Sequence, residues 1–239
     1  MSNTIRAAYQ GNEKLLAVWK TAPQGPLYDL TKSAVQQVES VWIRQGMIEA
    51  DERRSALAKR EDKTAVSREA LPTLANLRQK LANEQKKLDA RAGKLSPVEQ
   101  YREGDHATVQ IDLEMARLLR GMPPSERSAA LSQAGDLRLR DAVLRLPGQL
   151  TGISVEKRAQ LEQQAIEQRY PQEAAEIAET RIAMGDAIEA VQRAWAAVGA
   201  SVPLADRIEA AGDAEIAVDL EPGTAPDTVK GIHARHSSD

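Results

Sequence analysis

Residues 31–92 carry the apolar spacing of a helix over nearly their whole length, with Pro72 as their only proline. The stretch from 49 to 69 is mostly charged, so a helix there can bury only a narrow seam. Proline lacks the backbone N–H that a continuous helix needs at this position. A single helix of this length would extend about 90 Å at about 1.5 Å per residue. The pattern predicts a long charged helix that is kinked or broken near Pro72, or a helical hairpin, over residues 31–93.

The apolar composition favours helices over sheets. The 239 residues contain no Phe and no Cys, and aromatic residues make up only 3%. Because each aromatic side chain normally buries about 150–250 Å², a core built from Ala, Leu, Ile and Val instead is thin. Alternating apolar and polar runs, which a half-buried strand needs, are nearly absent. We therefore predict an all-α, elongated protein without disulfides or thiolate metal sites.

The pattern changes at several points along the chain, and these points divide it into four predicted segments. Proline and glycine near residue 25 end any helix of the first segment. The last segment is rich in acidic residues and then in Pro, Gly and Ser. The segments are an N-terminal arm over 1–30, the long charged helix or helical hairpin over 31–93, a helical bundle domain over 96–200, and an acidic segment with a flexible tail over 201–239.

Local signals place several helix ends. A short helix is expected over Arg6–Lys20 in the arm. Ser96 can cap a helix whose first residue is Pro97, with Glu99 completing the capping box. Further helices are expected in an antiparallel multi-helix array at about 124–134, 136–146 and 154–169, and from Pro171 to Gly199.

Some apolar residues are candidates for contact with neighbouring subunits. Charged helices with narrow seams expose more apolar surface than one copy can cover, so neighbours have to cover it. Packing into the chain's own core is the competing interpretation for all of them. The candidates are Trp19, Trp42, Leu74, Leu77, Leu81 and Leu88.

Charge is distributed unevenly along the chain, although the formal net charge is only −3. Residues 44–102 contain 14 Lys and Arg against 9 Asp and Glu, a balance of +5, and residues 205–229 contain 1 basic against 7 acidic residues, a balance of −6. These segments can attract each other, or they can be two separate solvated faces, which is the commoner case. A basic helix over 44–102 also permits contact with nucleic acid, although it lacks interleaved aromatic residues for base stacking.

Residues 127–146 have the outline of a helix-turn-helix. In that motif Gly135 would be the turn residue, and the positions of Asp136 and Asp141 should be apolar. The two aspartates favour an ordinary helix pair over a DNA-reading element. Asp141 and Arg145 are spaced i,i+4, so they are expected to pair on the helix surface.

Histidine motifs give little support for a metal site. Glu103 and His106 have the Glu-x-x-His spacing of di-metal helical bundles, but no second such motif occurs. His233 and His236 lie in the tail, where a rigid frame for a metal is not expected. Because the chain has no Cys and only three His, almost no side chains are available for thiol or imidazole catalysis. We expect no cofactor, no metal and no catalytic residue, with a carboxylate-only enzyme as a third alternative.

Residues 116–198 resemble uncharacterised helical proteins encoded beside head genes of tailed bacteriophages. The resemblance is carried by the Pro-Ser-Glu-Arg helix start at 124–127, by LRLPGQLTGIS at 144–154 and by RYPQEAAEI at 169–177. It implies a role in the virion or in its assembly, and it transfers no functional residues.

The leading prediction is a non-enzymatic structural or assembly protein of a tailed-phage virion, such as a minor head, connector-associated or scaffold-like protein. It is expected to act through helix-mediated contacts with other copies of itself and with other virion proteins. The alternative is a nucleic-acid-associated protein that uses the basic 44–102 helix. The N-terminus lacks the profile of a signal peptide, and no apolar stretch reaches the roughly 20 residues of a membrane span. The expected location is therefore the virion or the host cytoplasm, without a membrane partner.

Overall fold

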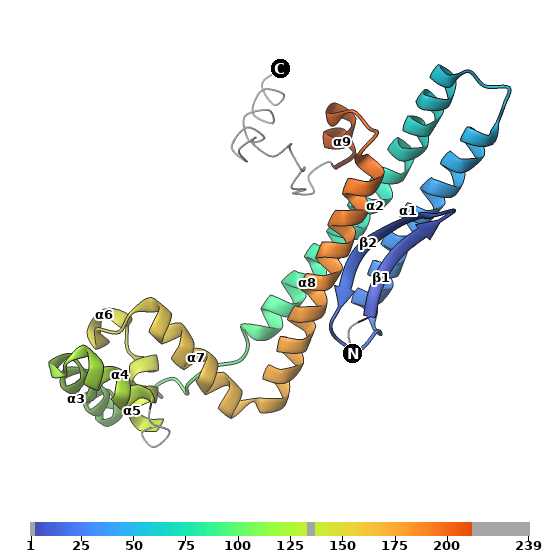
Figure 1. Ribbon diagram of the computed structural model, residues 1–239. Coiled ribbons are helices and arrows are strands. Elements are labelled where there is room, and N and C mark those ends of the chain that lie inside the picture. Colours follow the sequence, from blue (N-terminus) through green and yellow to red (C-terminus); the bar gives the residue numbers. More distant parts are fainter. Residues whose placement is uncertain (1–2, 133–136, 212–239) are drawn as a thin grey trace. The chain divides into compact units, whose positions relative to one another are not determined.

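The computed structural model describes residues 3–132 and 137–211 (Figure 1). This part of the chain is mostly helical and contains one two-stranded sheet. The predominance of helix confirms the coarse prediction, whereas the sheet contradicts a strictly all-α fold. Of the predicted acidic segment and tail over 201–239, residues 201–211 are described and include a helix over Leu204–Ala211. His233 and His236 lie outside the described residues, as does the Gly135–Asp136 turn.

The chain divides into two compact units, each with its own buried apolar cluster. Unit 1 comprises Met1–Lys87 and Glu179–Asp239, and unit 2 comprises Leu88–Ala178. These boundaries differ from the predicted segments, because the arm shares a unit with most of the long charged segment and with the end of the predicted bundle domain.

Helices form where the sequence pattern predicts most of them. Ser154 caps one of these helices by accepting a hydrogen bond from the Lys157 N–H at 3.2 Å. The helices α2 and α8 contribute residues to both units, α1 and α9 to unit 1, and the others to unit 2. The bounds are α1 Pro26–Ala50, α2 Ala56–Ala92, α3 His106–Gly121, α4 Pro124–Ser132, α5 Leu137–Arg145, α6 Gly148–Thr151, α7 Val155–Arg169, α8 Pro171–Gly199 and α9 Leu204–Ala211.

The predicted helix over Arg6–Lys20 is wrong, because this segment is an antiparallel hairpin of β1 (Asn3–Tyr9) and β2 (Asn12–Trp19). Tyr9 pairs with Asn12, which leaves Gln10 and Gly11 as a two-residue loop. Both have positive φ, 46° and 83°, as a tight hairpin turn requires. The glycine was the local signal for this turn.

A bulge in β2 disrupts the alternation of apolar and polar residues that is typical of a strand. Ile5 pairs with Ala17 and Arg6 pairs with Leu15, so Leu16 is an extra residue without a partner in β1. The extra residue allows Leu16, Ala17 and Trp19 all to be buried, although strict alternation would place Leu16 on the other face. The apolar residues therefore do not follow a period of two.

Carboxylates from two helices bind the backbone of the hairpin, one within β1 and one just after β2. Glu39 of α1 accepts a hydrogen bond from the Ala8 N–H at 3.2 Å. Asp186 of α8 accepts from the Lys20 N–H at 2.8 Å and from Lys20 Nζ at 3.0 Å. The hydrogen bond and charge of Asp186 raise the pKa of Lys20. The hairpin is thus fixed between α1 and α8, as Figure 1 shows.

The long charged segment is a helical hairpin whose break lies at residues 51–55, not at Pro72. Asp51 accepts a hydrogen bond from the Arg53 N–H at 3.0 Å, and Ser55 Oγ accepts from the Ala58 N–H at 3.2 Å. These two polar side chains stabilise the turn and the start of α2.

Pro72 lies inside an uninterrupted α2. A proline in a helix interior costs about 3 kcal/mol. Leu71 and Leu74, on either side of it, are fully buried in the core of unit 1. Burial of these two leucines stabilises the fold by about 3–6 kcal/mol. Tertiary packing therefore offsets the local cost of the proline.

Unit 2 starts its helices later than the capping box predicts. Residues 94–105 are not helical, and the Ser96 hydroxyl donates to the Val98 carbonyl at 2.6 Å instead of capping a helix. The helix α3 is capped by Asp105, which accepts from the Thr108 N–H at 3.2 Å. The prediction from Ser96 is therefore wrong at this point.

Two arginines of unit 2 bind the carbonyl groups that helix ends leave without partners. Arg158 of α7 donates to the carbonyls of Val143, Leu144 and Leu146 at 2.7–3.0 Å, at the end of α5. Arg127 of α4 donates to the carbonyls of Gly152, Arg120 and Met122 at 2.7–3.3 Å. These guanidinium groups hold the short helices together where the apolar core is thin.

Candidate functional site

The six predicted contact residues lie in or against the chain's own core. Trp19 is fully buried, donates from Nε1 to the Ala22 carbonyl at 3.1 Å, and packs edge-on against Tyr28 with ring centroids 5.2 Å apart. Trp42 is half-buried against the core of unit 1. The leucines Leu74, Leu77, Leu81 and Leu88 are buried. In-chain packing, the competing interpretation, therefore describes Trp19 and the four leucines, and the contact role of the half-buried Trp42 stays a prediction.

A buried ionic cluster in unit 2 replaces the predicted surface pair of Asp141 and Arg145. Asp112 of α3 has no exposed side-chain area, and it accepts from Arg145 Nε at 2.7 Å and Nη2 at 3.3 Å. The Tyr101 hydroxyl donates to the same carboxylate at 2.9 Å. Asp141 lies 3.6 Å from Arg140 instead. The cluster ties α3 to α5 and to the segment that precedes α3.

The hydroxyl of Tyr101 is expected to titrate later than an ordinary tyrosine. Burial, followed by the hydrogen bond and charge of Asp112, raises the pKa of Tyr101 to about 12. A folded pKa above the unfolded value means that the contact stabilises the fold below about pH 10 and that this stability is lost as the pH rises towards 12. Absorbance near 295 nm should show one tyrosine ionising late, and Tyr101→Phe should remove that step. Four tyrosines that titrate together near pH 10 would contradict the assignment.

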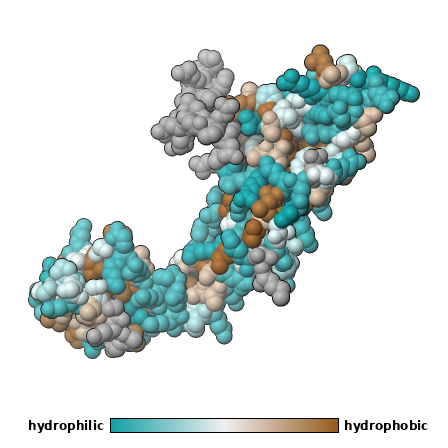
Figure 2. Space-filling view, viewed as in Figure 1, coloured by the Kyte–Doolittle hydropathy of each residue, from teal (hydrophilic) through white to brown (hydrophobic). Residues whose placement is uncertain are grey.

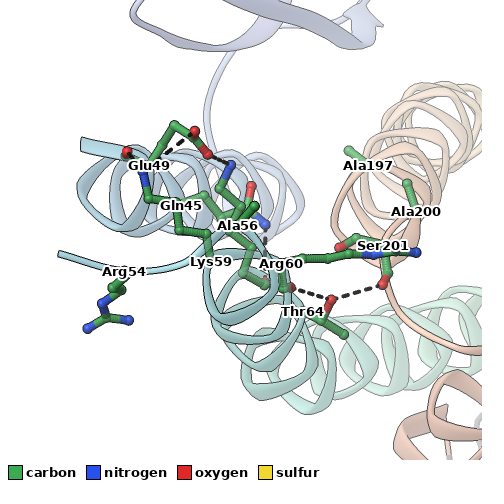
Figure 3. Close-up of a pocket in the computed structure, with 11 residues that line it drawn as sticks. Gln45, Glu49, Arg54, Ala56, Lys59, Arg60, Thr64, Ala197, Ala200 and Ser201 are labelled. Carbon is green, nitrogen blue, oxygen red and sulfur yellow. Dashed lines mark hydrogen bonds and ion pairs between the residues drawn. The ribbon is translucent and has the colours of Figure 1, made fainter. Parts of the chain in front are cut away.

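An open groove of about 780 Å³ lies in unit 1, between the α1–α2 turn and the C-terminal end of α8 (Figure 3). Its cations are Arg54, Lys59, Arg60 and Lys63, and Glu49 is the only carboxylate among the lining residues. Ala197, Ala200 and Ser201 form the opposite wall.

The lysines of the groove share a single carboxylate. Lys63 pairs with Glu49, and Lys59 Nζ donates to the backbone carbonyl of Glu49 at 2.6 Å and lies 4.0 Å from its carboxylate. The hydrogen bond from Lys63, then the charges of both lysines, hold the pKa of Glu49 below its usual value. Arg54 is held by Asp51 at 3.0 Å and by Asp62. Within the described residues, the Arg60 guanidinium pairs with no carboxylate.

A second surface is an apolar row on α3 in unit 2. Ile111, Met115 and Leu118 are spaced i, i+4 and i+7, so they lie on one side of the helix. Ile111 is 40% exposed and Leu118 60% exposed, whereas Met115 is half-buried against the core. Glu114 and Arg117 form an ion pair beside the row.

Other sequence motifs have structural places. His106 is the first residue of α3, and Glu103 lies in the preceding turn. Within residues 3–132 and 137–211, no group of three or more His, Asp or Glu is arranged to hold a metal, and no helix is long and apolar enough to span a bilayer. Arg140 and Arg145, two of the three arginines in the second helix of the 127–146 element, bind Gln168 and Asp112 of the same unit.

Comparison of the chain with protein families, with curated proteins and with solved structures finds no match.

Proposed function

We propose that this chain is a non-enzymatic structural or assembly protein of a tailed-phage virion, which works as one copy among several through helix-mediated contacts. The observation that carries the proposal is the apolar row of Ile111, Met115 and Leu118 on α3, in which Ile111 and Leu118 are exposed. Apolar residues at i, i+4 and i+7 beside an ion pair are the arrangement with which a helix packs against a partner helix. A second copy of the chain is the proposed partner.

Surface exposure elsewhere in unit 2 supports this proposal. Val155 at the start of α7 is 80% exposed, and Leu137 at the start of α5 is 51% exposed. Figure 2 shows hydrophobic residues of this kind on a mostly hydrophilic surface. Covering each of these side chains with a neighbour gains roughly 1 kcal/mol or more, and several together stabilise a subunit contact.

The buried carboxylates also favour a structural role. Among the described residues, Asp112 and Asp186 are the buried acids, and each is bound to a cation. A general acid or base has to reach a substrate, whereas these groups are engaged with the chain's own residues. The resemblance of residues 116–198 to helical proteins encoded beside phage head genes agrees with the proposal. The proposed role in the virion is that of a minor head, connector-associated or scaffold-like protein.

Size-exclusion chromatography with light scattering tests the proposed contact. We expect the full chain to form an oligomer, and Leu118→Glu to raise its dissociation constant at least about tenfold because a charge would have to be buried. Gln110→Glu, an exposed change of the same charge on the same helix, is the control and should leave the oligomer unchanged. Far-UV circular dichroism should show that both variants fold.

Two results would contradict the assembly proposal. One is a wild-type chain that stays monomeric up to about 100 μM, a concentration at which even a weak contact would be detected. The other is an oligomer that Leu118→Glu and Gln110→Glu leave equally intact.

A further inference from the structure

Three cations near the start of α2 face one groove. Lys59, Arg60 and Lys63 are spaced so that their side chains lie on neighbouring positions of one side of the helix, and all three line the groove. Figure 3 shows Arg60 extended across the groove towards Ser201 at the end of α8. Positively charged side chains of unit 1 therefore lie together at this groove, which has no role in the proposed subunit contact.

Several other cations of the basic segment 44–102 are neutralised by nearby carboxylates. Arg44 pairs with Glu69 at 2.6 Å, and Arg68 and Arg91 pair with Asp206 and Glu176. The segment is also not one helix, since residues 51–55 and 93–105 interrupt it. The groove is the place where four cations of this segment line one cavity.

The cations of the groove have N–H donors that their carboxylate partners do not occupy and that can bind an external anion. An ammonium group has three N–H donors and a guanidinium group five. Lys59 and Lys63 share Glu49, and Arg60 has no carboxylate partner among the described residues. An added anion would bind Lys59 and Arg60 without breaking the contact between Lys63 and Glu49.

We propose that this groove binds the phosphate backbone of a nucleic acid, independently of base sequence. The groove is open to solvent, which suits a continuous chain of phosphates better than a small enclosed ion. In the opposite wall, Ala197 and Ala200 have no polar side-chain group to read a base edge, and the Ser201 hydroxyl is bound to Ser67 Oγ at 3.1 Å. The Gln45 amide, which is able to read one, is bound to Ser67 Oγ at 2.9 Å.

This binding site goes beyond the proposed assembly function. The groove belongs to unit 1 and the apolar row on α3 belongs to unit 2. Leu118→Glu should therefore leave nucleic-acid binding by each chain intact, and a change at Arg60 should leave the oligomer intact. Failure of one proposal is distinguishable from failure of the other.

Fluorescence anisotropy with a labelled DNA duplex of random sequence tests the proposal. We expect binding at about 50 mM salt that weakens about 12-fold at about 200 mM, as release of counterions from two phosphate contacts predicts. Arg60→Glu should weaken binding at least about tenfold and make the salt dependence shallower.

Lys86→Glu is the matched control, because it makes the same charge change on an exposed lysine of α2, about 40 Å along the helix from Arg60. It should change the affinity less than about twofold. The proposal is overturned if the wild-type chain does not bind at the lower salt concentration, or if Arg60→Glu and Lys86→Glu weaken binding equally.

Discussion

Replacing Asp112 with alanine is expected to lower the free energy of unfolding of unit 2 by about 3–5 kcal/mol. The change removes the carboxylate that accepts two hydrogen bonds from Arg145 and one from Tyr101. The Arg145 side chain is only 12% exposed, so its charge would stay largely buried without a partner. The penalty arises mostly from that uncompensated charge.

Amide hydrogen exchange measures this effect where it arises. Protection should fall in α3 and α5, which the cluster connects, more than in α1 and α2 of unit 1. Glu114→Ala is the control, since it removes an exposed carboxylate of α3 and should cost less than about 0.5 kcal/mol. Equal protection in the two variants would show that the buried cluster does not stabilise unit 2.

Replacing Trp19 with alanine is expected to destabilise unit 1 by about 3–5 kcal/mol. The side chain is fully buried, and it joins the end of β2 to α1 through its edge-on contact with Tyr28. Alanine would leave a cavity among side chains that cannot close it completely. It would also remove the hydrogen bond to the Ala22 carbonyl.

Urea unfolding at several protein concentrations separates a core role from a contact role. A core residue lowers stability equally at all concentrations, whereas a residue between subunits acts through the concentration dependence of unfolding. Trp42→Ala provides the comparison and should cost less, because Trp42 is only half-buried. If Trp19→Ala lowers the free energy of unfolding by less than about 1 kcal/mol, Trp19 does not have the role in the core of unit 1 that its burial indicates.

The candidate surfaces were only partly accessible to sequence reasoning. The basic segment 44–102 includes the cations of the groove, but its charge balance does not distinguish neutralised cations from available ones. Arg44 and Arg68 are paired with acids 25 and 138 residues away. The sequence also does not show that the row on α3 is exposed. An apolar residue in a helix is predicted to be buried unless the positions of the neighbouring helices are known.

Local chemistry determined most helices of this protein from its sequence. Ser154 starts α7, proline opens α4 and α8, and Gly199 ends α8, because capping and proline geometry act within one helical turn. The same reasoning missed the hairpin, where a bulge at Leu16 shifts the alternation of β2. It also placed the break of the long helical segment at Pro72 instead of at 51–55.

Only the tertiary structure decided which partners the polar groups take. Arg145 binds Asp112 across 33 residues and not Asp141 one turn away, and Lys20 binds Asp186 across 166 residues. A charge pair becomes strong only where packing removes water from it, and that depends on which segments fold against one another. Spacing along the chain specifies which groups can meet within one helix, whereas the shared core specifies which of them are buried together.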